Sequence, residues 1–192
     1  DPVTAESLFP PAQLVAEHCT YSGNYYVYAV VSDGAGGWFM GGIFPSLQGV
    51  KIANLVHLNS DGTIDPTFDA QVNGQVNTLK LINGVLYAGG SFSSVGGVDR
   101  FRVAAIDPAT GSDLGWAPNI PGTVYAFEKN AAGDILIGGS FSQVNSPYVG
   151  SLGALVDGVT ATVDTAIPKF TGQSGDFVKA AISDGSGGWY IG

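Results

Sequence analysis

The side chains best suited to chemistry form a short pattern that begins at His57 and reads H-x-N-x-D-G-x-x-D. Calcium prefers hard oxygen ligands, and carboxylate or amide oxygens at alternate positions around a glycine bend can supply them. Asn59, Asp61 and Asp65 are therefore weak candidates for a calcium site. However, an imidazole nitrogen, which is a poor calcium ligand, occupies the first position, and the pattern occurs once. We therefore expect a hairpin in which Asn59 and Asp61 hold the turn and no metal is bound.

No set of catalytic residues stands out. The chain has two histidines, His18 and His57, and one cysteine, Cys19. Adjacent residues of a strand face opposite sides of a sheet, so His18 and Cys19 are badly placed to share a proton or a metal. The sequence contains no G-x-S-x-G, phosphate-loop or H-E-x-x-H motif. We therefore expect a protein that is not an enzyme and that carries no cofactor.

Paired carboxylates are the remaining catalytic arrangement to weigh, because glycosidases use an acid and a second carboxylate. Many of the aspartates follow apolar runs, in predicted turns where Asp usually caps backbone N–H groups. The chain has only three glutamates, which are Glu6, Glu17 and Glu128. A carbohydrate-active enzyme with part of its site outside this sequence is the alternative function.

Aromatic and cationic side chains in predicted loops are the candidates for ligand binding. Tyrosine beside small polar residues suits carbohydrate or protein recognition, and loops tend to carry binding residues. The candidates are Tyr21, Tyr25, Arg100, Phe101 and Tyr148. We expect Arg100 and Tyr148 to be exposed to solvent.

The composition excludes several classes of function. The chain has 192 residues, with 16 acidic and 7 basic side chains and a net charge of −9. It offers no basic stripe, so we expect no nucleic-acid partner. It has no run of about 18 apolar residues, so we expect no membrane span. A single cysteine rules out an internal disulfide and a cysteine-rich zinc site.

A glycine-glycine motif recurs along the chain and indicates the elements that position these side chains. Its first glycine lies at positions 41, 89, 138 and 192, which gives steps of 48, 49 and 54 residues. The segment SDGAGGWFMG, which ends at Gly41, matches SDGSGGWYIG, which ends at Gly192, at seven of ten positions. A repeat of this length predicts the blades of a β-propeller.

Each repeat is typical of short strands joined by tight turns. An apolar run opens it, a D-G or N-G turn follows, and the glycine-glycine strand comes next. A third strand and a weaker fourth complete the unit. We predict an all-β chain of antiparallel four-stranded blades that step by about 50 residues. Because paired glycines suit close backbone approach at an axis, we expect their strands to be the innermost.

The repeats also indicate where one expected blade ends and the next begins. The expected blades span residues 26–75, 76–123 and 124–176, and residues 177–192 begin a fourth. Residues 1–25 do not resemble the repeat and are expected to be a linker or a closing strand. The fourth unit stops inside a motif that continues in every earlier copy, so we expect a fragment of a longer propeller.

The repeat resembles the delta-60 repeat family, which consists of β-propeller repeats in bacterial secreted and surface proteins. The family pattern DG-x-ILVGG-x-F is similar to GDILIGGSF at 133–141, and R-L-N-x-DG-x-x-D-x-x-F is similar to HLNSDGTIDPTF at 57–68. The second and third units depart from it, with DPATG at 107–111 and VDGV at 156–159. The resemblance implies a propeller and an extracellular setting, and it implies no known chemistry.

These observations favour a non-enzymatic recognition module that is secreted or lies at the cell surface, such as an adhesin head. Loops that follow Phe44, Phe92 and Phe141 differ while the flanking strands repeat. We expect such loops to bind a glycan or a protein on a surface. A structural spacer in a surface fibre is a further alternative, and exposed sheet edges leave a homo-oligomer open.

Overall fold

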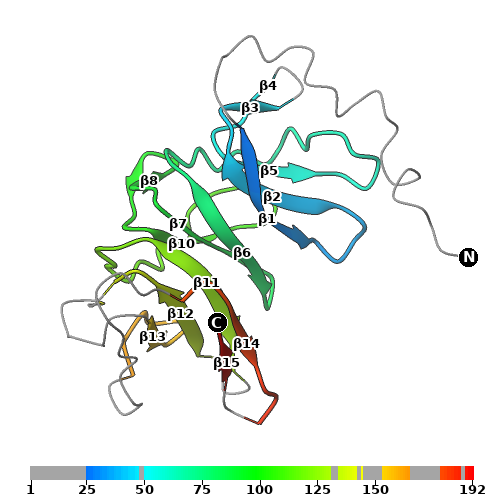
Figure 1. Cartoon of the computed structure of the whole chain (residues 1–192). Helices are drawn as coiled ribbons and strands as arrows, with labels where there is room; N and C mark the ends of the chain where they lie inside the picture. Colours follow the sequence, from blue (N-terminus) through cyan, green and yellow to red (C-terminus); the bar gives the residue numbers. More distant parts are fainter. Residues whose placement is uncertain are drawn as a thin grey trace, which may run out of the picture.

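The computed structural model describes residues 25–47, 50–130, 134–141, 144, 153–164, 178–186 and 189–192. Within these residues every regular element is a β-strand. The strands form three three-stranded antiparallel sheets, a two-stranded fourth sheet and two small hairpins. The sheets follow one another in an arc that is not closed (Figure 1). The predicted all-β propeller architecture is confirmed, and we call the four sheets blades one to four.

Blade one has the strand order β1–β2–β5. β1 spans Tyr26–Ser32, β2 spans Trp38–Ile43 and β5 spans Leu55–Leu58. Between β2 and β5 lies a hairpin of β3 (Ser46–Leu47) and β4 (Val50–Lys51). Three consecutive antiparallel strands that pair with their neighbours in sequence are the framework of a propeller blade.

Blade two repeats this arrangement with the order β10–β7–β6. β6 spans Val76–Ile82, β7 spans Val85–Gly90 and β10 spans Val103–Ile106. The hairpin between β7 and β10 consists of β8 (Ser94–Val95) and β9 (Val98–Asp99). The two blades therefore share the extra hairpin as well as the main strands.

Blades three and four complete the described part of the chain. β11 spans Val124–Lys129, β12 spans Ile135–Gly139 and β13 spans Gly153–Val156. β14 (Ala181–Ser183) and β15 (Trp189–Ile191) form the two-stranded sheet. Where a fourth strand was expected, the described residues of the first three blades show a single bridge after the third strand. The bridges are Leu58–Ile64, Ile106–Asp113 and Val156–Val163.

The turn between β6 and β7 shows why an N-G pair lies there. Asn83 and Gly84 both have a positive φ, of 51° and 77°. A two-residue hairpin of this kind needs left-handed backbone at both central positions, which Asn and Gly adopt at little cost.

The glycine-glycine motif lies in the central strand of the first three blades, at β2, β7 and β12. The first strands β1, β6, β11 and β14 are instead the ones that lie side by side from blade to blade (Figure 1). The expectation that the glycine strands are innermost is therefore wrong. The side chains that crowd the first glycine of each pair belong to the next blade. A Cβ on Gly41, Gly89 or Gly138 would lie 2.5–2.7 Å from side chains that follow in the next repeat.

Apolar side chains fill the spaces between blades. One cluster between blades one and two includes Phe39, Leu86 and Phe92, and a second between blades two and three includes Phe127 and Ile137. Every residue of β10, β12 and β13 is buried, because these strands are covered on both faces. Burial of apolar surface at about 25 cal/mol per Å² makes this stacking the main source of stability.

Candidate functional site

The side chains of the calcium pattern hold turns. Asp61 Oδ1 accepts hydrogen bonds from the hydroxyl and N–H groups of Thr63, at 2.6 and 2.9 Å. These bonds keep the pKa of Asp61 below its usual range. The Asn59 amide donates to the Thr63 hydroxyl at 3.0 Å. Asp65 Oδ1 instead accepts from the N–H and hydroxyl groups of Thr67. Asp61 and Asp65 thus serve two different turns.

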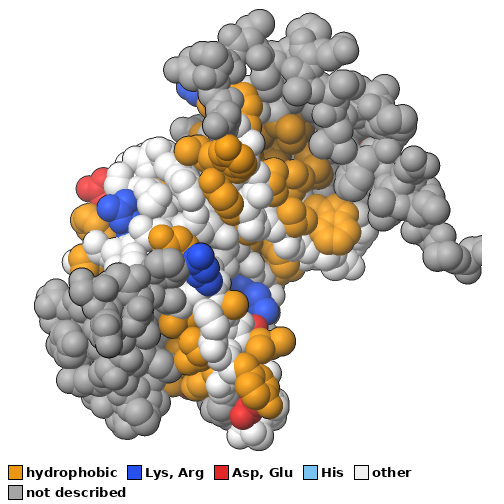
Figure 2. Space-filling model, viewed as in Figure 1, with side chains coloured by type: hydrophobic (Ala, Val, Ile, Leu, Met, Phe, Trp, Pro, Cys, Tyr) orange, Lys and Arg blue, Asp and Glu red, His pale blue; other side chains and the backbone are white. Residues whose placement is uncertain are grey.

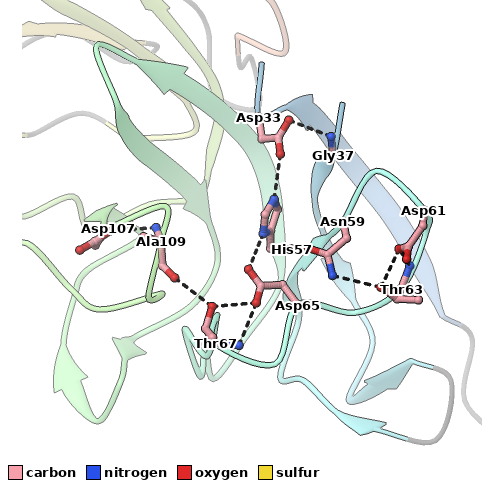
Figure 3. Close-up of polar contacts among 10 residues, drawn as sticks. All are labelled: Asp33, Gly37, His57, Asn59, Asp61, Thr63, Asp65, Thr67, Asp107 and Ala109. Atoms are coloured by element: carbon pink, nitrogen blue, oxygen red, sulfur yellow. Dashed lines mark hydrogen bonds and ion pairs between the residues drawn. The ribbon is translucent and has the colours of Figure 1, made fainter. Parts of the chain in front are cut away.

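His57 lies at the centre of a polar network that joins three segments of blade one (Figure 3). Its Nδ1 is 2.9 Å from Oδ2 of Asp65, and its Nε2 is 3.2 Å from Oδ2 of Asp33. The ring stacks on Phe39, with 4.4 Å between centroids. The three polar side chains are largely buried, with only 13–16% of their surface exposed. The network therefore ties the β1–β2 hairpin to β5 and to the turn that follows β5.

Both carboxylates of this network are stabilised in their charged form. Burial acts to raise the pKa of Asp33, but hydrogen bonds from Ala35, His57 and Gly37 outweigh it and lower the pKa. Asp65 follows the same pattern, because bonds from His57 and its own turn outweigh burial and lower its pKa. An imidazole that carries hydrogen on both nitrogens satisfies both carboxylates at once.

This arrangement leaves neither nitrogen of His57 for a substrate. A histidine that acts as general base needs one nitrogen within reach of the proton that it removes, and here both nitrogens face carboxylates. Nor does any group of three His, Cys, Asp or Glu side chains in the described ranges have the placement to hold a metal ion. In this geometry the trio acts as a clasp within blade one.

The sequence analysis included His57 and Asp65 only in the calcium pattern, and it missed Asp33. A signal was present in the repeat. Alternate turns of an antiparallel sheet lie at the same end, and the turn after β1 and the turn after β5 both contain D-G. Asp33 is the aspartate of the first turn and Asp65 follows the second, so a histidine near the end of β5 can reach both.

Arg100 has a structural partner and is not a free cation. Its Nε donates to Oδ1 of Asp113 at 2.7 Å, and a second guanidinium nitrogen pairs with Oδ2 of the same carboxylate. A third nitrogen donates to the Asp99 carbonyl at 2.7 Å. Only 14% of the Arg100 side chain is exposed. The expectation that Arg100 is exposed to solvent is therefore wrong, because a bidentate ion pair holds it against the blade.

The other predicted binding residues do not form a common surface in the described part of the chain. Phe101 is 53% exposed. Tyr25 is partly buried and packs against the apolar cluster of blade one, which consists of Phe44, Ile52, Val56 and Leu58, so it contributes to the core. Tyr21 and Tyr148 lie outside the described residues. The structure thus leaves Phe101 as the one exposed member among the described candidates.

A hollow of about 520 Å³ lies between blades two and three. Its volume falls within the range of about 300–1,000 Å³ that is common for ligand sites. Leu114 and Val159 line it and are themselves exposed, by 51% and 88%. Asn83 and Lys129 add polar groups to the wall. The sequence analysis did not predict this hollow.

The wall of the hollow also contains two buried aromatic rings that join the blades. The Tyr87 hydroxyl donates to the Gly158 carbonyl at 3.0 Å, and the Trp116 indole N–H donates to the Asp157 carbonyl at 3.1 Å. The rings meet edge to face, with 5.1 Å between centroids. Burial, together with the charge of Asp157, raises the pKa of Tyr87, so its hydroxyl stays protonated as a donor.

Comparison of the repeats explains why the hollow forms at this place. Phe39 pairs with His57 in blade one, and Tyr87 pairs with Ala105 in blade two. Ala105 is therefore the equivalent of His57. The methyl group of Ala105 takes the position of the His57 imidazole. Leu114 takes the position of Asp65, which is a partner of that imidazole in blade one. The space that the clasp fills in blade one is open in blade two.

Known β-propellers are similar to this chain. A family model described as "Domain of unknown function (DUF5122) beta-propeller" matches residues 35–68 and 83–111. The crystal structure of the WD40 β-propeller domain of Doa1 superimposes with a TM-score of 0.59 at 15% sequence identity. The fold is a β-propeller. The superposition covers 88% of this chain and 48% of the Doa1 chain, so this propeller chain spans about half the length of that one.

No curated protein sequence is detectably similar to this β-propeller chain. The two similarities support a β-propeller repeat family, and the delta-60 assignment stays a prediction. In the part of the chain that the structure describes, no helix is long and apolar enough to span a membrane.

Proposed function

We propose that this chain belongs to a non-enzymatic recognition module that acts outside the cell and binds a protein ligand. The observation that carries the proposal is the hollow between blades two and three, with its exposed apolar rim of Leu114 and Val159. Binding pockets are commonly lined by apolar side chains with a few polar groups, and this hollow has that lining. The extracellular setting rests on the resemblance of the repeat to delta-60 sequences.

The accessible surface of the hollow favours a protein over a glycan. Sugar recognition commonly uses the exposed face of an aromatic ring, but Tyr87 and Trp116 are each only 6% exposed. The accessible groups are aliphatic, with Asn83 and Lys129 beside them. An apolar side chain of a peptide, flanked by a backbone carbonyl or an acidic group, matches this lining.

A displayed random peptide library, panned against the purified chain, tests the proposal. We expect enriched peptides to share an apolar anchor. Val159→Asp should weaken their binding by about tenfold, or about 1.4 kcal/mol, because it places a charge at the apolar rim. Val50→Asp is the matched control, since Val50 is also exposed, by 49%, but lies on β4.

Three outcomes would contradict the proposal. One is a library that yields no enriched peptide, and another is peptide binding that Val159→Asp and Val50→Asp reduce equally. The third is a glycan-array signal that Val159→Asp abolishes in the absence of peptide binding, because it would assign the hollow to a sugar. Surface labelling of the cells that make the protein tests the extracellular setting separately.

A further inference from the structure

The turn between β6 and β7 places an asparagine and a glycine at the exposed tip of a hairpin. Asn83 and Gly84 are both exposed, and both have left-handed backbone. An Asn-Gly pair is prone to modify itself, because glycine has no side chain to keep the asparagine amide away from the next backbone nitrogen. Asparagine is accordingly among the thermolabile residues of proteins. The hairpin tip is therefore a candidate for such a reaction.

The reaction is an attack of the Gly84 backbone nitrogen on Cγ of Asn83. A bond forms between these two atoms, the Cγ–Nδ2 bond breaks, and the side-chain nitrogen leaves as ammonia with the proton of the Gly84 N–H. Water then opens the succinimide ring at either of its carbonyl carbons, which gives aspartate or isoaspartate. Water is the only co-reactant, and no atom is oxidised or reduced. The net change replaces a neutral amide with a carboxylate.

The structure leaves the reacting groups of Asn83 and Gly84 accessible. Among the described residues, no hydrogen-bond partner holds the Asn83 carboxamide or the Gly84 N–H. A Cβ on Gly84 would meet nothing within 4 Å, so the residue that carries the attacking nitrogen is surrounded by open space. The carboxamide can therefore rotate until its Cγ reaches that nitrogen.

A second Asn-Gly pair of the chain, Asn73 and Gly74, is held in place. The Asn73 amide donates to the Ser93 hydroxyl at 2.9 Å, and its oxygen accepts from the N–H groups of Ser93 and Ser94, both at 2.9 Å. A Cβ on Gly74 would lie 2.9 Å from Cα of Phe92, so this glycine packs against backbone. The chain thus contains one fixed pair and one free pair of the same two residue types.

The free pair lies at the hollow between blades two and three. Asn83 and Lys129 both line this hollow, and Asp157 is the other charged residue of its wall. The Asp157 carboxylate already serves its own turn, because its Oδ1 accepts from the N–H groups of Val159 and Thr160. Charged side chains are also sparse on the described surface that Figure 2 shows. A new carboxylate at position 83 would therefore change the charge of the wall strongly.

We propose that Asn83 is a site of spontaneous deamidation, which adds a negative charge to the hollow as the protein ages. Asn73 stays intact, because its amide would first have to break three hydrogen bonds. The consequence for ligands rests on the proposed function. A carboxylate at position 83 offsets the charge of Lys129, so peptides that carry an acidic group beside their apolar anchor should bind less tightly.

Peptide mapping by mass spectrometry, after incubation of the folded chain in mildly alkaline buffer, tests the site. We expect aspartate and isoaspartate at position 83, formed at least about tenfold faster than at position 73, which is a barrier difference of about 1.4 kcal/mol. The chain unfolded in guanidinium chloride is the control, and there both pairs should react at similar rates. An intact Asn83 in the folded chain, or equal rates at Asn73 and Asn83 there, would overturn the proposal.

Two variants separate the chemistry from its consequence. Ser93→Ala removes a hydrogen bond from Asn73, so it should speed the reaction at Asn73 and leave the rate at Asn83 unchanged. Asn83→Asp imitates one product and should weaken acidic peptides from the library by about tenfold at low salt, and by less at high salt. Equal binding by Asn83→Asp and the wild type would contradict the change in ligand preference. The mass measurement needs no ligand, so its result stands apart from the outcome of the peptide library.

Discussion

The two glycines of each pair lie against different neighbours, and the difference matters for what each position tolerates. A Cβ on Gly90 would lie 2.0 Å from the Gln75 carbonyl oxygen, which is backbone. A Cβ on Gly89 would meet the side chains of Val124 and Phe127, which belong to the next blade. Side chains can rotate, whereas a strand carbonyl is fixed by its sheet. The second glycine is therefore the stricter requirement.

We predict that Gly90→Ala destabilises the fold more than Gly89→Ala. Overpacking costs about 1–3 kcal/mol, and Gly90→Ala should lie at the upper end because backbone must move. Gly89→Ala should cost less because the neighbouring side chains can yield. Denaturant-unfolding midpoints of the two variants give the comparison. A larger loss for Gly89→Ala would mean that the blade interface, and not the strand, sets the requirement.

At the residue scale, the sequence predicted that these glycines are crowded. It did not predict which neighbouring atoms crowd them. The spacing of 48 and 49 residues placed Gly41, Gly89 and Gly138 at one structural position. Which strand faces the axis depends on how the blades pack, and strand periodicity carries no information about that. His57 illustrates the same limit, since its partner Asp33 lies 24 residues away in another hairpin.

At the scale of elements, the β8–β9 hairpin is fastened to its blade by the ion pair of Arg100 and Asp113. Arg100 follows β9, and Asp113 forms the bridge that replaces the fourth strand of blade two. The sequence predicts a binding loop here, because arginine and aromatic residues are enriched at interfaces and the equivalent loops differ between repeats. Charge and loop position alone do not show whether a carboxylate from the next turn meets the guanidinium.

The ion pair changes the expected effect of Arg100→Ala. We predict a loss of about 1.5–3 kcal/mol in unfolding free energy, because Asp113 would keep a poorly solvated charge without its hydrogen-bonded partner. The Arg100→Ala, Asp113→Asn double variant should recover part of this loss. Lys51→Ala, at an exposed residue of β4, should have little effect. If the double variant loses as much unfolding free energy as the two single variants together, the ion pair contributes no interaction energy.

At the scale of the whole molecule, the repeat predicted the class of fold, and the blades diverge where function is expected. The same site is a polar clasp around His57 in blade one and an open hollow beside Ala105 in blade two. Equivalent positions in a repeat can be aligned from sequence. Whether a smaller side chain leaves a cavity depends on whether neighbours such as Trp116 move into it, and that requires the three-dimensional packing.

The carboxylates of the chain also make its stability depend on pH, in a direction that the structure sets. Asp33, Asp61, Asp65 and Asp157 all have a pKa below the usual value for aspartate. A carboxyl group with a lower pKa in the folded state stabilises the fold at pH values above about 3.9, its unfolded pKa. That contribution is lost as the pH falls through the lower folded pKa. Stability from these groups should therefore be constant near neutral pH and should decline below about pH 4.

We predict that Asp65→Asn reduces this acid sensitivity while it lowers stability at pH 7. At neutral pH the variant loses a charge-assisted bond to His57, which is worth about 1.5–3 kcal/mol. Below about pH 4 the wild-type carboxylate becomes protonated and loses the same advantage, so the two unfolding free energies should converge. Urea titrations between pH 7 and the acid limit of folding measure both curves. Asp99→Asn, at an exposed residue of β9, should instead run parallel to the wild type throughout. If the unfolding free energy of Asp65→Asn instead runs parallel to that of the wild type at every pH, the clasp around His57 does not depend on the charge of Asp65.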